Sequence, residues 1–324
     1  MPDMDLEKLI QGIKDRNRRM IAKTMTLIES RVTVHQELAA KIMEQILPMT
    51  GNSIRLGVTG VPGVGKSTFI ENLGVYLADA GHQVAVLAVD PSSRRSGGSI
   101  LGDKTRMEQL SSHANAFIRP SPAGDTLGGV AAKTREIMLV CEAAGFDVIL
   151  VETVGVGQSE TAVAAMVDFF LVLMIAGAGD ELQGIKKGVL ELADGIAINK
   201  ADGDNQDRVA RAKKDLENAM HLIMPASAAW QTPVMTCSSV TENGTVPVWE
   251  TVLKHRNIFK ASGEFDQRRK NQALEWMWTL VEDGLRQMFK DNRKINAQIP
   301  VVSGQVVKGE ISPTAAARTL LSYL

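Results

Sequence analysis

The run GVPGVGKS at residues 60–67 constrains this chain most, because it matches the pattern G-x-x-x-x-G-K-[ST]. It lies between the β-rich run Ile54–Thr59 and a helix expected to begin near Ser67. Glycines there let backbone N–H groups turn toward phosphates, the lysine reaches the β and γ oxygens, and the serine binds magnesium. The run therefore predicts a phosphate site and not a chance glycine-rich turn. The residues expected to contact the nucleotide are Gly60, Val61, Pro62, Gly63, Val64, Gly65, Lys66, Ser67 and Thr68.

Short β-rich runs alternate with amphipathic stretches from residue 54 to about residue 260. This alternation predicts an α/β fold, a P-loop NTPase with a mostly parallel central sheet flanked by helices. Helical periodicity before and after it predicts an N-terminal segment at 1–50, a P-loop domain at 51–260 and a C-terminal helical segment at 261–324. Ser312 is expected to cap the last helix, with Pro313 in its first turn. The β-rich runs are IRLGVTG, VAVLAVD, AFIRPS, DVILVET, FFLVLMI, GIAINK and PVMTCS.

The segment INKAD at residues 198–202 indicates guanine specificity. In the pattern Asn-Lys-x-Asp, the Asp202 carboxylate would accept hydrogen bonds from the ring N–H and exocyclic amine of guanine, which adenine lacks at those positions. Lys200 would pack along the base, and Asn199 would brace the loop. Alone, the tetrapeptide could be an ordinary strand-to-helix turn, but after a P-loop it favours GTP. Two further base contacts are expected in the loop TCSS, unless it is a simple turn: Ser238 and Ser239.

Three acids are candidate magnesium ligands beside Ser67. Asp90 ends the run VAVLAVD, Asp103 lies in SILGDKT, and Glu152 stands in VETVGVGQSE where a GTPase usually carries aspartate. A carboxylate at the end of a neighbouring strand can bind magnesium directly or through water. Asp90 could instead cap a turn, and Asp103 could be an acid of a surface loop.

The residue that orients the attacking water is not evident from the sequence. Val156 follows Gly155 at the position where a catalytic glutamine often stands, and its side chain has no hydrogen-bonding group. We therefore expect slow unaided hydrolysis. Gln158 could orient the water from two residues further on, or it could only bond to the backbone.

Together these segments, with GAGDELQGIKKG, resemble the MeaB/ArgK type of P-loop GTPase, which includes the methylmalonic aciduria type A protein. The resemblance covers essentially the whole chain. It implies a homodimeric GTPase that acts as chaperone and gatekeeper of adenosylcobalamin-dependent methylmalonyl-CoA mutase, with 51–260 as GTPase domain and 261–324 as dimerisation segment. It assigns metal roles to Asp90, Asp103 and Glu152. It also implies three switch segments, and a catalytic role for Lys186 in the third of them. From residue chemistry alone, the part of that segment with the sequence DELQGIKK is instead a solvated helix face.

Other function classes are less consistent with the sequence. An ATP-dependent kinase tied to arginine or ornithine transport is the main alternative, and the base motif argues against it. With 36 basic and 37 acidic residues, the chain has no positive excess to neutralise nucleic acid or anionic lipid. Its 2 cysteines form no Cys-x-x-Cys pair, and its 5 histidines are too dispersed for a nickel-inserting GTPase. No apolar run has spanning or signal-peptide length, so we expect a cytoplasmic protein without membrane contact.

The C-terminal segment contains two patterns of its own. The basic run QRRK at residues 267–270 is expected to be a solvated helix face. The following LEWMWTLV carries apolar residues at helical spacing, with Trp276 and Trp278 on different faces. It suits a helix packed against a second chain or within its own chain.

Overall fold

The computed structural model describes residues 5–89, 107–120, 127–153, 159–176, 187–221, 227–241 and 244–324. The chain divides into two compact units, Met1–Lys270 and Asn271–Leu324. Across the described ranges, no helix combines the length and the apolar character that a membrane crossing needs.

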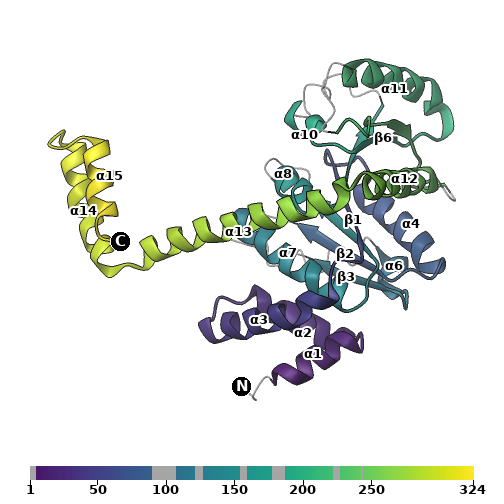
Figure 1. The fold of residues 1–324 in the computed structure, drawn as a ribbon. Helices are drawn as coiled ribbons and strands as arrows, with labels where there is room; N and C mark the ends of the chain where they lie inside the picture. The colour runs from purple at the N-terminus through teal and green to yellow at the C-terminus, as the bar shows by residue number, and fades with distance from the viewer. Residues whose placement is uncertain are drawn as a thin grey trace. The chain divides into compact units, whose positions relative to one another are not determined.

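A seven-stranded sheet forms the centre of the first unit (Figure 1). The strand order is β3-β2-β4-β1-β5-β6-β7, and every neighbouring pair is parallel. All seven predicted runs form strands, which confirms the α/β fold. The strands are β1 (Ile54–Gly60), β2 (Val84–Val89), β3 (Ala116–Pro120), β4 (Val148–Thr153), β5 (Phe169–Ile175), β6 (Gly195–Asn199) and β7 (Val234–Thr236). Because all run the same way, their carboxyl ends meet at one edge of the sheet.

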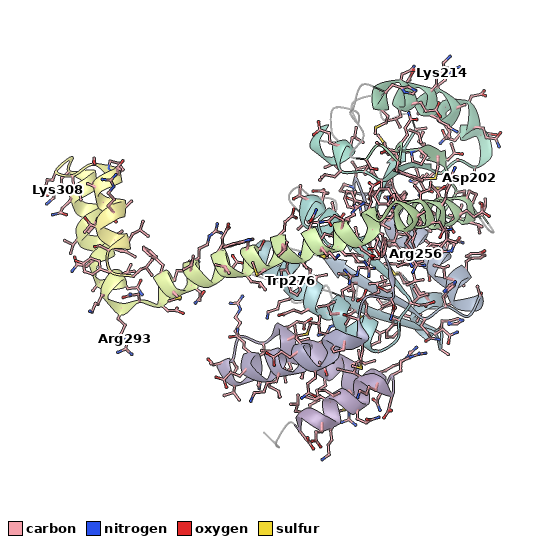
Figure 2. The ribbon with its side chains drawn as sticks, in the orientation of Figure 1. Asp202, Lys214, Arg256, Trp276, Arg293 and Lys308 are labelled. Atoms are coloured by element: carbon pink, nitrogen blue, oxygen red, sulfur yellow. The ribbon has the colours of Figure 1, made fainter. Side chains whose placement is uncertain are left out.

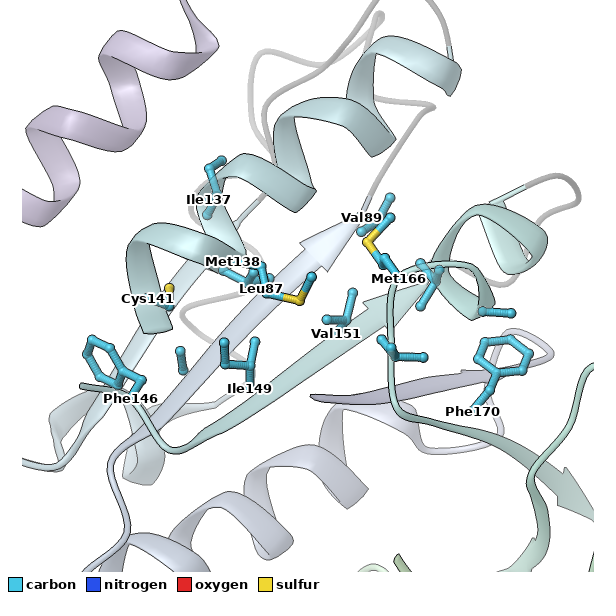
Figure 3. Packing of buried hydrophobic residues seen from close by; sticks show 14 of the residues in the cluster. Leu87, Val89, Ile137, Met138, Cys141, Phe146, Ile149, Val151, Met166 and Phe170 are labelled. Carbon is cyan, nitrogen blue, oxygen red and sulfur yellow. The ribbon is translucent and has the colours of Figure 1, made fainter. Parts of the chain in front are cut away.

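Helices cover both faces of the sheet, which explains why its strands are almost continuously apolar. On one face lie α7 (Leu127–Ala143), α8 (Ser159–Ala164) and α11 (Gln206–Met220). Figure 3 shows part of this core, where Met138 and Cys141 of α7 lie over Leu87 and Ile149 of the sheet. On the other face lie α4 (Lys66–Asp79), α6 (Glu108–Ser112) and α12 (Val246–Ser262).

Three amino-terminal helices extend the first of these cores. They are α1 (Leu6–Lys14), α2 (Arg18–Glu29) and α3 (Thr33–Ile46), followed by the 3-10 turn η1 (Leu47–Met49). The helices pack on one another and on α7, and they bury Ile13, Ile21, Met25 and Ile42 completely. Asp5 and Asn17 cap α1 and α2 through side-chain oxygens, so the short helices have defined starts.

The described residues of the second unit form helices joined by short turns. It contains most of α13 (Glu264–Asp291), together with α14 (Arg293–Val307) and α15 (Pro313–Leu321), which pack on each other. Ser312 Oγ accepts a hydrogen bond from the Ala315 N–H at 3.2 Å, and Pro313 begins α15. The predicted cap is therefore confirmed.

The expectation that QRRK is a solvated helix face was wrong for its two arginines. Arg268 forms a two-pronged ion pair with Asp194 at 2.9 Å, and Arg269 forms one with Asp168 at 2.7 and 2.8 Å. Only 14% of the Arg269 side chain is exposed. Both aspartates directly precede strands, β6 and β5, so the start of α13 is bound to the amino edge of the sheet. Lys270 is exposed, as expected.

Candidate nucleotide-binding site

The P-loop connects β1 to α4 at the carboxyl edge of the sheet. Gly60 ends β1, and α4 begins at Lys66. Gly63 and Gly65 have φ angles of 82° and 98°, a backbone region that residues with a side chain rarely adopt. At Gly65 a Cβ atom would also lie 2.8 Å from Asn199 Nδ2. The glycines of the motif are therefore required by backbone shape and by close packing.

Lys66 lies inside this loop with its ammonium group largely shielded from solvent. Its Nζ donates hydrogen bonds to the carbonyls of Gly60 at 2.7 Å and Val61 at 3.2 Å. Burial lowers the pKa of Lys66 below its ordinary value, while the negative charges of Glu152 and Glu160 raise it. The lysine is thus held where P-loop lysines meet the β and γ phosphates, with two carboxylates that favour its charged form.

Ser67 and Glu152 meet at the same edge. Glu152 is the residue before the end of β4, which pairs with β1, and Ser67 is in the first turn of α4. Ser67 Oγ donates to Glu152 Oε1 at 2.9 Å. Next to them, Thr153 Oγ1 donates to Thr59 Oγ1 at 2.7 Å. A hydroxyl and a carboxylate oxygen so close together are the donor types that magnesium prefers, so the residues fit this metal.

Asn199 joins the P-loop to both base loops. Its Nδ2 donates to the Val64 carbonyl at 2.8 Å, and its Oδ1 accepts from the backbone N–H and hydroxyl of Ser239 at 3.1 and 2.8 Å. The amide is 1% exposed, so each of these bonds forms away from water. One buried side chain therefore fixes the distance between the P-loop and the loops predicted to contact the base.

Lys200 and Asp202 follow Asn199 at the end of β6. Lys200 has a positive φ of 59°, and its Nζ donates to the Gly63 carbonyl at 3.1 Å. Ser238 Oγ donates to Asp202 Oδ2 at 2.5 Å, which orients the carboxylate (Asp202 is labelled in Figure 2). The structure thus brings together both predicted base loops, INKAD and TCSS.

Four of the predicted site residues lie outside the described residues: Asp90, Asp103, Gln158 and Lys186. Their roles stay predictions. Within the described ranges no group of three or more histidine, cysteine or acidic side chains is arranged to hold a metal ion.

Sequence reasoning assigned no role to Glu160 or to Cys237. Cys237 Sγ donates a weak hydrogen bond to Asn199 Oδ1 at 3.6 Å, and burial raises the pKa of its thiol to about 12, so it is a packing group of the base site. Glu160 is 8% exposed, and its charge acts on Lys66. A second acid in the glycine-rich run that carries Glu152 was the sequence signal that could have revealed it.

The family described as "Methylmalonyl Co-A mutase-associated GTPase MeaB" matches residues 21–294. The chain belongs to the MeaB family. It is 46% identical to the GTPase ArgK of Escherichia coli over 98% of this chain and 96% of the relative. It is 42% identical to the mouse mitochondrial methylmalonic aciduria type A homolog, over 98% of this chain and 79% of that protein.

Among solved structures, a protein described as LAO/AO transport system kinase superposes with a TM-score of 0.80. It is 39% identical, and the match covers 100% of this chain and 98% of that one. The MeaB-family chain is a GTPase, as its family description and the name of its E. coli relative state. The kinase alternative has less support, because the family description and the E. coli relative are both described as GTPases, whereas the name of the solved structure refers to a kinase.

Proposed function

We propose that this MeaB-family GTPase binds adenosylcobalamin-dependent methylmalonyl-CoA mutase, gates loading of its cofactor, and protects or reactivates it. The family description and the name of the mouse relative support this partner. The observation that carries the proposal is the group of predicted nucleotide-binding residues that meet at one edge of the sheet, from Lys66 to Asp202. A chaperone that is timed by GTP needs such a site.

The geometry supports selective binding of guanine nucleotides. Ser238 holds one oxygen of Asp202, so the carboxylate is oriented before the base arrives. Asn199 keeps this acid at a fixed distance from the P-loop, because the Asn199 side chain bonds both to the P-loop and to the TCSS loop. An oriented acceptor that guanine can satisfy and adenine cannot favours GTP over ATP.

P-loop GTPases generally bind their nucleotide with magnesium, and here Ser67 and Glu152 would hold the ion. When bound, magnesium neutralises the charge that develops on the phosphates. Lys66 adds a fixed positive charge to the same phosphates. Asp90 and Asp103 are proposed as further metal ligands.

Slow hydrolysis without a partner follows from Val156, which cannot orient water. We propose that the mutase accelerates hydrolysis by rearranging the segment AGAGDELQGIKKG, so that Lys186 enters the nucleotide site. A cation placed on the transferring phosphoryl group can be worth roughly 10³-fold or more in rate. Gln158 is proposed to orient the attacking water in that arrangement.

Steady-state GTPase assays with and without the mutase test this function. Lys186→Ala is expected to keep slow unaided hydrolysis and GTP affinity, but to lose most of the stimulation by mutase. Lys187→Ala, at the first residue of α10 (Lys187–Glu191), is the matched control and is expected to keep it. Equal stimulation of wild type and Lys186→Ala would reject the role of this lysine. No stimulation or binding of wild type by such a mutase would reject the chaperone function.

We also propose that the protein is a homodimer joined through its C-terminal segment, 261–324. In the second unit, α13 exposes large apolar side chains at spacings of three or four residues. Such a stripe covers one side of a helix and is typical of helix pairing between chains. Its members are Leu274, Met277, Trp278, Val281, Leu285 and Met288.

A further inference from the structure

Glu160 is a buried acid, and one of its oxygens has no partner among the described residues. It is the second residue of α8 and the last residue of the run VETVGVGQSE, which also carries Glu152 and Val156. Only 8% of it is exposed, and among the residues that the structure describes its Oε2 has no hydrogen-bond partner. A buried carboxylate oxygen that lacks a donor is costly, and a ligand that brings a donor to it would remove this cost.

The position of α8 is tightly defined by the sheet beneath it. The helix packs on β1, β4 and β5, the strands that surround the P-loop. Gly57 of β1 allows this approach, because a Cβ atom there would lie 2.9 Å from Val163 Cγ1 of α8. Glu160 therefore belongs to a helix that packs directly on the strands that lead to the candidate nucleotide site.

The charge of Glu160 reaches the phosphate pocket. Glu160 and Glu152 both lie close enough to Lys66, the lysine of the P-loop, for their charges to interact with its ammonium group. Two of the ammonium donors bond to the Gly60 and Val61 carbonyls. Glu152 differs from Glu160, because its Oε1 already accepts from Ser67. Among the residues that the structure describes, Glu160 Oε2 is therefore an acceptor near Lys66 that is left for a ligand.

We propose that Glu160 is a positioning residue of the nucleotide site, and that its Oε2 accepts a hydrogen bond from a water molecule of the magnesium–nucleotide complex. A carboxylate suits this role, because water bound to magnesium or attacking a phosphorus atom is a strong donor. The water is bound either to the metal or in line with the γ phosphate, and binding and turnover measurements distinguish the two. The proposal depends on the GTPase activity and not on the identity of the protein partner.

Glu160→Gln is the main test, because it keeps the shape of the side chain and removes its charge. Thermal unfolding without nucleotide is expected to occur at the same or a higher temperature, since a neutral amide is cheaper to bury than a carboxylate with an unsatisfied oxygen. The kcat for GTP is expected to fall about tenfold or more, the equivalent of one hydrogen bond to a charged group. Glu160→Asp, which keeps the charge on a shorter side chain, is expected to recover part of kcat.

Glu142→Gln is a matched control, because Glu142 is 5% exposed and its carboxylate is fully engaged by Arg55, Ser53 and the Gly51 N–H. This variant is expected to unfold at a lower temperature and to keep kcat per folded molecule. The contrast separates an acid retained for its ligand from one retained for the fold.

Titration of GDP with magnesium and with a chelator locates the water. If it is bound to the metal, Glu160→Gln reduces the magnesium-dependent gain in GDP affinity. If it is the attacking water, GDP binding is unchanged with or without magnesium, and only GTP turnover falls. A Glu160→Gln protein that unfolds at a lower temperature, or that keeps wild-type kcat and magnesium dependence, would overturn the proposal.

Discussion

At the scale of single residues, the nucleotide site depends on side chains that each connect two loops. Asn199 bonds to the P-loop through its amide nitrogen and to the TCSS loop through its oxygen. The hydrogen bond from Ser238 to Asp202 joins the TCSS loop to the INKAD loop. The order of the motifs predicted which residues would meet, because the carboxyl ends of parallel strands share one edge. The partner of each atom depends on loop conformations that spacing does not encode.

Asp202→Asn is expected to shift preference from guanine to xanthine nucleotides. The new amide donates where the carboxylate accepted, which suits the additional carbonyl of xanthine. Titrations with GDP, XDP and ADP measure the change. Asp204→Asn, two residues further on in the exposed 3-10 turn η3 (Gly203–Asn205), is the control and should leave GDP binding unchanged. Unaltered GDP affinity in Asp202→Asn would remove this acid from the base site.

At the scale of secondary-structure elements, the sequence predicted strands better than it predicted how α13 begins. Central strands such as β5 and β6 are buried on both faces, so a short apolar run was a sufficient signal. The two arginines of QRRK instead pair with acids 74 and 101 residues earlier in the chain. A helix pattern reports neighbours three or four residues apart, and distant ion partners leave no trace in it. The unassigned Glu160 was missed because its environment is likewise tertiary.

Arg269→Ala is expected to destabilise the first unit by about 3 kcal/mol, because it leaves the buried Asp168 carboxylate without its countercharge. The variant also removes donors to the carbonyls of Gly51 and Ser53. Chemical denaturation at fixed protein concentration measures the loss. Lys270→Ala, at the exposed neighbouring position, should change stability by less than about 0.5 kcal/mol. Similar values for both variants would show that the ion pair contributes little.

At the scale of the whole molecule, the two compact units have different surfaces. The first unit has two apolar cores, one on each face of the sheet. The second exposes a row of them along α13, including Trp278 at 60% and Met288 at 62%. An apolar row of this length is unfavourable in water unless another surface covers it. The proposed dimer supplies that surface from a second copy of the chain.

Leu285→Glu is expected to convert the dimer to a monomer, because a charge in the middle of the stripe would be buried without a partner. Thr279→Glu is the matched control, since 100° per residue places it on the opposite side of α13. Sedimentation at several concentrations measures both. A Leu285→Glu protein that remains dimeric would place the interface elsewhere.

The strand order also has a consequence for synthesis of the chain on the ribosome. The central strand β1 pairs with β4 and β5, and neither of them is its neighbour in sequence. At roughly 5–20 residues per second, Val148 is made several seconds after Gly60. During that interval the nascent chain carries the strand that leads into its P-loop with no partner on either side. The helices α1–α3 are made first, but the face that they pack against α7 stays uncovered until α7 has also emerged.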